Sequence, residues 1–164
     1  MRLGACWKWW LVACAAVLAA GCASPPRTVS GQDSGPWSGR LAIQVEDNQR
    51  ESFSAGFELK GSATAGELAL YNPLGGTLAV LDWAPGKATM RSNDQTREFE
   101  SVDSLVAHAT GAAIPVAALF DWLRGIDTLV PGWQADLSLL PQGRLRAQRL
   151  QPPPPADLRV VLDR

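Results

Sequence analysis

The chain has 164 residues, of which 46% are hydrophobic and 19% charged, and these proportions suit one globular domain with an apolar core. The formal net charge of −1 gives no support for a strongly basic surface, so we expect no nucleic-acid partner.

Residues 1–21 have the features of a secretory signal peptide. Arg2 and Lys8 are positive, and residues 9–20 are apolar or small but too few and wrongly flanked for a membrane-spanning helix. Ala19-Ala20-Gly21-Cys22 resembles the lipobox of bacterial lipoproteins, with Ala19 at the place of the usual leucine. We therefore expect lipidation at Cys22. An ordinary secretory signal with an incidental cysteine is the alternative.

The cysteine count favours the lipoprotein interpretation. Cleavage before Cys22 removes Cys6 and Cys14, and one remaining cysteine cannot form an internal disulfide. A second lipobox-like sequence ends at Cys14, but it leaves only five apolar residues after Lys8. In enterobacteria an aspartate directly after the lipidated cysteine signals retention in the inner membrane. This chain has Ala23 at that place and so resembles lipoproteins destined for the outer membrane. The mature net charge of −3 predicts no basic patch that holds the protein on anionic lipid, so we expect the lipid to anchor it.

Residues 22–36 predict a lipidated flexible tether, because they are rich in Ser, Pro and Gly. A single domain then spans residues 37–164. Alternating apolar and polar residues predict strands, and 67–71 and 77–83 are apolar at nearly every position, which favours strands with two non-aqueous faces. Four prolines at 152–155 predict a stiff connector. The predicted strands are 39–47, 50–60, 67–71, 77–83, 87–92, 95–99, 133–140, 143–150 and 158–162.

Two short amphipathic helices interrupt the strands. Ser101 can cap a helix that begins at Val102 and ends at Gly111, and Pro115 suits the first turn of a second helix that ends at Gly125. This pattern predicts a mainly antiparallel β fold with a helical insert, in which one curved sheet carries the helices on its concave side. A fully closed barrel is the alternative.

No motif of nucleophilic, metal or phosphate chemistry is present in the sequence, so we expect no enzyme, no cofactor and no metal site. His108 is the only histidine and is interpreted as a surface or boundary residue. Asp82 lies in an apolar strand and is either a partly buried carboxylate or a salt-bridged outward residue. Arg144, Arg146 and Arg149 predict a solvated strand face, although Arg149 fits the inward alternation with Leu145 and Ala147.

The stretch YNPLGGTLAV, residues 71–80, places a leucine at the tip of a turn. Asn72 and Pro73 begin the turn, and Gly75 and Gly76 complete it. Turn tips normally face water, so Leu74 is either exposed for a purpose or folded back onto the domain.

Several segments resemble the LolB family of outer-membrane lipoprotein receptors. They are 70–75 (LYNPLG), Thr110-Gly111 with Ile114-Pro115, and Leu119 with Trp122-Leu123 and Gly125, together with the lipobox. The resemblance extends over about 37–133. It implies an incomplete, unclosed antiparallel β-barrel whose short helices cover an apolar cavity.

The resemblance also implies a function. The family accepts triacylated lipoproteins from the periplasmic carrier LolA and delivers them to the inner leaflet of the outer membrane, without covalent chemistry. We expect a monomer that is lipid-anchored at the periplasmic face of that membrane. The family's insertion loop corresponds to Asn72, Pro73, Leu74 and Gly75. The expected acyl-chain cavity residues are Leu41, Ile43, Phe53, Phe57, Leu68, Leu70, Leu78, Val80, Leu105, Val106, Leu119, Phe120 and Leu123.

Two other functions remain as alternatives. One is a passive lipoprotein that binds an apolar ligand or acts as a scaffold, which needs no exposed Leu74. The other is a hydrolase that uses a pair of carboxylates, for which Asp82 is the first residue to test.

Overall fold

The computed structural model describes residues 36–46 and 52–163. Residues Gly31–Arg164 form one compact unit, and the described hydrophobic core lies within it. The signal peptide, Cys22, nearly all of the tether and the connection between the first two predicted strands lie outside the described residues. Within the part that is described, no helix has the length and apolar character needed to span a bilayer.

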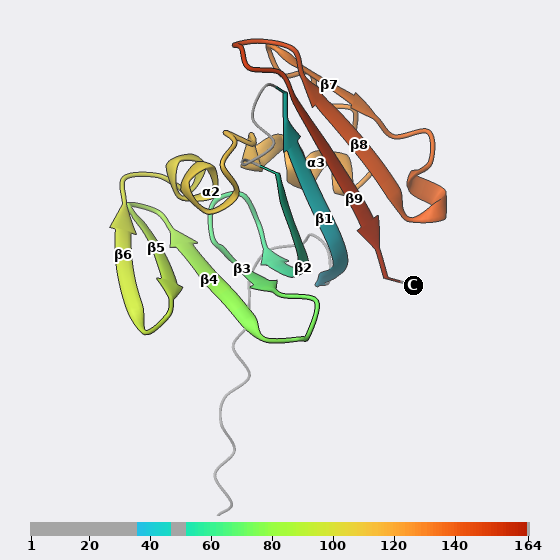
Figure 1. The fold of residues 1–164 in the computed structure, drawn as a ribbon. Coiled ribbons are helices and arrows are strands. Elements are labelled where there is room, and N and C mark those ends of the chain that lie inside the picture. The colour runs from blue at the N-terminus through green and yellow to red at the C-terminus, as the bar shows by residue number, and fades with distance from the viewer. Residues whose placement is uncertain (1–35, 47–51, 164) are drawn as a thin grey trace, which may run out of the picture. The chain divides into compact units, whose positions relative to one another are not determined.

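The strands of the described residues form one nine-stranded antiparallel sheet with the order β6-β5-β4-β3-β2-β1-β9-β8-β7 (Figure 1). Because β6 and β7 lie at its two edges, the sheet does not close among the described strands, and the closed-barrel alternative is excluded. The strands are β1 (Trp37–Val45), β2 (Phe53–Gly61), β3 (Gly66–Tyr71), β4 (Thr77–Ala84), β5 (Lys87–Ser92), β6 (Gln95–Phe99), β7 (Trp133–Asp136), β8 (Arg144–Arg149) and β9 (Ala156–Leu162).

Two helices, α2 (Val102–Thr110) and α3 (Val116–Leu123), follow β6 and lie on one side of the curved sheet (Figure 1). Ser101 caps α2 and Gly111 ends it in the left-handed conformation, as the sequence predicts, and the structure adds a reciprocal bond from Ser104. Pro115 gives α3 no side-chain cap. Instead, Asp103 Oδ1 accepts a hydrogen bond of 3.2 Å from Val116 N, so α2 caps α3 and the two helices are joined.

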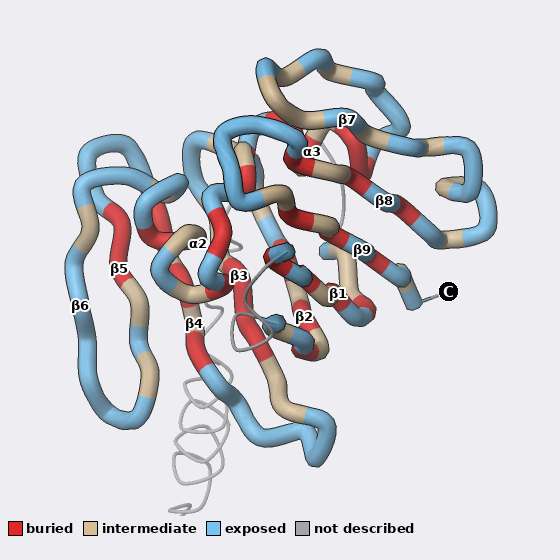
Figure 2. Tube along the Cα trace, turned by 45° about the horizontal axis from the view of Figure 1, so that its top comes forward, coloured by how far each residue is buried: buried red, intermediate tan, exposed pale blue. Residues whose placement is uncertain are grey.

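The core forms between the inner face of the sheet and the apolar sides of both helices. Alternate residues of each central strand are buried, such as Leu41, Ile43 and Val45 of β1, and Figure 2 shows this alternation along the chain trace. Trp122 of α3 is 1% exposed, and its Nε1 donates to Thr128 O at 3.0 Å. A buried indole with a satisfied N–H fixes the end of the helical segment against the sheet.

Three sequence expectations are corrected by the structure. The strand predicted over 133–140 ends at Asp136, because the Asp136 carboxylate accepts from Ser138 N at 3.0 Å and a 3-10 helix, η2 (Leu140–Gln142), follows. Arg149 is not on a solvated face but buried on the inner side of β8, where its Nη2 donates to Pro154 O at 3.0 Å. β4 buries only one face fully, since Leu78 on its other face is 37% exposed.

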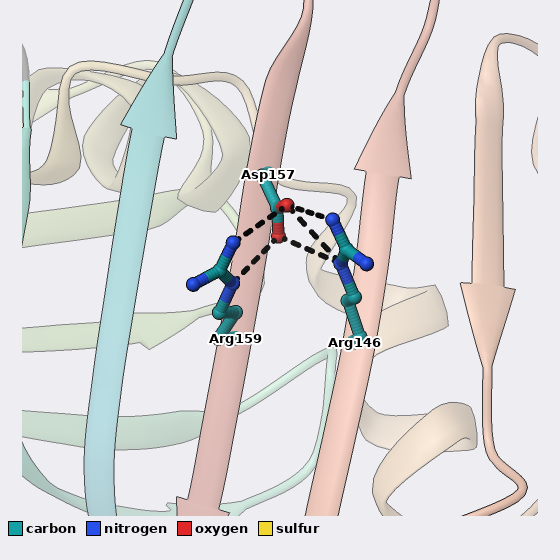
Figure 3. Close-up of polar contacts among 3 residues, drawn as sticks. All are labelled: Arg146, Asp157 and Arg159. Atoms are coloured by element: carbon teal, nitrogen blue, oxygen red, sulfur yellow. Dashed lines mark hydrogen bonds and ion pairs between the residues drawn. The ribbon is translucent and has the colours of Figure 1, made fainter.

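An ion cluster on the outer face of the sheet contributes stability that is lost at low pH. Arg146 of β8 and Arg159 of β9 approach the Asp157 carboxylate from two sides (Figure 3). Burial alone would raise the pKa of Asp157, but hydrogen bonds from both arginines outweigh burial and hold that pKa below its ordinary value. The folded protein therefore favours the carboxylate, and this stabilisation is complete above about pH 4 and is lost as the pH falls through the folded-state pKa.

We expect the difference in unfolding free energy between wild type and Asp157→Asn to be largest above about pH 4 and to shrink as the pH is lowered below it. Urea unfolding of both proteins at a series of pH values measures this difference. A difference that stays constant down to the acid transition would contradict the assignment.

Candidate functional site

The loop between β3 and β4 presents Leu74 to solvent. Leu74 is 96% exposed, the highest value among the large hydrophobic residues that the structure describes as exposed. Figure 1 shows the loop at the lower end of β3 and β4, the end away from α2, and Figure 2 shows the loop as exposed. The alternative in which Leu74 folds back onto the domain is therefore excluded for this structure.

Asn72 holds the loop in shape. Its Oδ1 accepts hydrogen bonds of 2.9 Å from both Leu74 N and Gly76 N, while Asn72 N donates to Gly76 O at 2.8 Å. A Cβ at position 76 would lie 2.8 Å from Asn72 Nδ2, so glycine leaves the room that this side chain needs. Gly75 adopts φ +85°, which glycine accepts without strain. The leucine is thus displayed by a constrained turn.

We expect Asn72→Ala to loosen the loop, because two backbone N–H groups lose their acceptor. A hydrogen bond of this kind contributes about 1 kcal/mol, so amide exchange at Leu74 and Gly76 should accelerate about five-fold. Asn72→Asp keeps a side-chain oxygen at the same place and is the matched control. Amide exchange followed by NMR measures both variants, and equal rates in wild type and Asn72→Ala would show that the side chain does not organise the turn.

A small cavity lined by apolar side chains and Thr110 lies between the inner face of the sheet and the helical segment. Its volume is about 30 Å³. An engineered protein cavity that binds one benzene molecule measures about 150 Å³, so an acyl chain does not fit in the closed arrangement of this structure. The cavity is lined by Leu41, Phe57, Leu59, Leu68, Trp83, Val106, Thr110, Ile114, Val116, Leu119, Leu123, Leu158 and Val160.

The residues predicted from the sequence for an acyl-chain cavity either line the cavity, pack in the surrounding core, or lie on the outer face of the sheet. Leu41, Phe57, Leu68, Val106, Leu119 and Leu123 line the cavity. Ile43, Leu70, Leu105 and Phe120 are buried in the surrounding core, and Phe53 packs against that core while partly buried.

Leu78 and Val80, which were predicted for the cavity, neither line it nor belong to the buried core. They share the outer face of β4 with Asp82, whereas Ala79, Leu81 and Trp83 face inward. Side chains alternate along a strand, so an all-apolar strand does not reveal its inward face from sequence alone. The prediction that Leu78 and Val80 line the cavity is therefore wrong, because both lie on the outward face of β4.

Sequence reasoning missed several lining residues. Leu59 lies two residues after Phe57 on the same strand face, so alternation could have identified it. Leu158 and Val160 lie on β9, which pairs with β1, and this non-local pairing has no sequence signal. Trp83 is fixed by its Nε1, which donates to Ser62 O at 2.9 Å, and by an edge contact with the Phe120 ring at 6.3 Å between centroids.

The two residues considered for catalysis have ordinary surroundings. His108 is exposed, with its Nε2 3.4 Å from Arg97 Nη1 and its ring 5.2 Å from that of Phe99. Asp82 faces outward and lies 3.0 Å from Arg91 Nη2 in a salt bridge. Over 36–46 and 52–163, no cluster of His, Cys, Asp and Glu is arranged to hold a metal ion.

Comparison with known proteins identifies relatives over most of the chain. The family model described as "Outer membrane lipoprotein LolB" matches residues 36–152. The outer-membrane lipoprotein LolB of Bordetella petrii is 39% identical over 121 residues, which are 71% of this chain and 61% of that protein. The Bordetella pertussis protein of the same name is 38% identical over 111 residues, 65% of this chain and 56% of the relative.

A third relative, the outer-membrane lipoprotein LolB of Cupriavidus metallidurans, is 31% identical over 140 residues, 82% of this chain and 65% of that protein. The matches to these three relatives span between 56% and 65% of the relatives' own length.

Proposed function

The chain belongs to the LolB family of outer-membrane lipoproteins, and from this membership we propose that it accepts triacylated lipoproteins from a periplasmic carrier of the LolA type and inserts them into the inner leaflet of the outer membrane. The observation that carries the proposal is Leu74, which is 96% exposed and held outward by Asn72. The protein acts as a monomer that a lipid on Cys22 anchors.

Acyl-chain binding requires the helical segment to move. We define the lid as residues 102–123, which contain α2, α3 and their connection. The lid residues at the cavity are apolar except Thr110, whose hydroxyl donates to Val106 O at 2.8 Å and so presents no unpaired donor. Outward movement of the lid joins its apolar side and the inner sheet face into one larger acyl site.

The driving force for each transfer is burial of acyl chains. Each buried methylene contributes about 0.8 kcal/mol, so cargo passes to this protein only if its open cavity covers the chains better than the carrier does. The bilayer covers them better still. No nucleotide or covalent step is needed in such a downhill sequence.

Leu74 directs the last step toward the membrane. Burial of one leucine in the bilayer interface is worth about 1.5–3 kcal/mol, which favours a transient contact but does not hold the protein there alone. A transient contact is suitable, because the protein must release its cargo into the bilayer and return to the carrier.

A reconstituted transfer assay tests the proposed function. Carrier loaded with a labelled lipoprotein is mixed with residues 31–164, the compact unit that contains the described core, and with liposomes. We expect label to move from carrier to this protein and then to liposomes. If no label leaves the carrier, the receptor function fails and the passive apolar-ligand protein becomes the better description.

A further inference from the structure

Four arginines gather on the outer face of β1, β9 and β8. The strand register places Arg40 of β1 and Arg144 of β8 on either side of Val161 of β9, and it places Arg146 of β8 directly opposite Arg159 of β9. All four arginines are exposed. Neighbouring strands lie about 4.8 Å apart and residues rise about 3.3 Å along a strand, so these charges lie within about 12 Å of one another at the backbone. We call Arg40, Arg144, Arg146 and Arg159 the arginine patch.

The patch carries uncompensated positive charge. Asp157 accepts hydrogen bonds from both Arg146 and Arg159, so one carboxylate serves two guanidinium groups. Arg40 and Arg144 form no ion pair with any residue in 36–46 or 52–163. Even with Asp136 of β7 and Asp163, which follows β9 opposite Ser38, counted together with Asp157, the four arginines keep a net charge of +1 on a chain whose formal charge is −1.

Stability of the sheet explains Arg146 and Arg159, because both arginines bond the Asp157 carboxylate. It does not explain Arg40 and Arg144, which form no ion pair among the described residues. Guanidinium groups are weakly hydrated, and the donors they do not use on Asp157 are suited to phosphate oxygens. The unpaired charge therefore has the chemistry of a site for phosphate anions.

Apolar side chains lie within the same surface. Val161, at the centre of the patch, is 50% exposed, and Leu139, just before η2, is 49% exposed. Both line a groove of about 280 Å³ together with Arg144, Arg146 and Arg159. A mixture of cationic groups and exposed aliphatic side chains is typical of protein surfaces that lie in the headgroup region of a bilayer.

We propose that the arginine patch binds the phosphate groups of an anionic phospholipid surface and so orients the anchored domain on its membrane. Cationic side chains near an anionic bilayer each increase binding about five-fold, and salt screens the attraction. The inference does not depend on cargo transfer, because vesicle binding is measured without carrier or cargo.

Sedimentation with vesicles tests the inference. Residues 31–164 are mixed with vesicles of phosphatidylcholine alone or of phosphatidylcholine with phosphatidylglycerol, at low and high salt. We expect tighter binding to the anionic vesicles, weakened by salt. The double variant Arg40→Gln/Arg144→Gln should bind anionic vesicles about 25-fold more weakly, and its binding to neutral vesicles should not change. These two arginines lie outside the Asp157 cluster, so the fold should be retained.

Arg91→Gln is the matched control, since Arg91 is an exposed arginine on the outer face of β5 that is paired with Asp82. It should bind like wild type. Equal binding of the double variant and wild type to anionic vesicles would overturn the inference. So would a double variant that keeps vesicle binding but fails to take cargo from the carrier, because the patch would then serve an acidic protein partner.

Discussion

Leu74→Glu is expected to take cargo from the carrier at the wild-type rate and to deliver it to liposomes about one to two orders of magnitude more slowly. The leucine is 96% exposed and touches no part of the core, so uptake and folding should not depend on it. Loss of about 1.5–3 kcal/mol of interfacial burial accounts for the slower delivery. The glutamate adds a further cost, because a charged carboxylate enters the interface unfavourably.

Leu129→Glu is the control that separates this role from a general effect of surface charge. Leu129 is 90% exposed in the segment between α3 and β7, so the substitution changes the same chemistry at a different place. Its delivery rate should equal that of wild type. Equal delivery by Leu74→Glu and wild type would remove the leucine from the mechanism, and equal impairment by both variants would mean that charge alone slows delivery.

The sequence predicted the elements that depend on local chemistry. Ser101, Gly111 and the i, i+3, i+4 pattern define α2 within one residue, since caps and apolar spacing act over a single turn. Most strands were found because alternation has a period of two. The predicted strand after 133 was too long, because the Asp136 turn interrupts a segment whose apolar residues continue through Leu140.

Features that depend on pairing between distant strands were not predicted. The arginine patch joins β1, β8 and β9, whereas the sequence grouped only Arg144 and Arg146 of its members on one solvated strand face. The mature net charge of −3 gave no sign of a local basic patch. The inner face of β4 was ambiguous for a related reason, since its apolar residues occur at both parities and only packing against the lid decides which side is buried. Asn72 was expected to belong to the loop, but its two hydrogen bonds to the turn came from the structure.

We expect a protein whose lid is fixed to the sheet to take up cargo at least about ten-fold more slowly than wild type. The reason is that the closed cavity of about 30 Å³ excludes an acyl chain. Arg97 on β6 and His108 on α2 touch each other at 3.4 Å, so cysteines at these two positions can be joined by a short bis-maleimide. Residues 31–164 contain no cysteine, and the introduced pair is therefore the only reactive one. Asp103 connects α2 to α3, so restraint of one helix restrains both.

The control is a cross-link that leaves the lid free. Arg91 of β5 and Thr96 of β6 are register partners on the outer face, and cysteines there join two strands that are already paired. This protein should take cargo like wild type after the same treatment. If the protein cross-linked between positions 97 and 108 also takes cargo normally, acyl chains do not bind in the cavity beneath the lid but elsewhere on the protein. The exposed inner surface near the open edges of the sheet would then be the place to search.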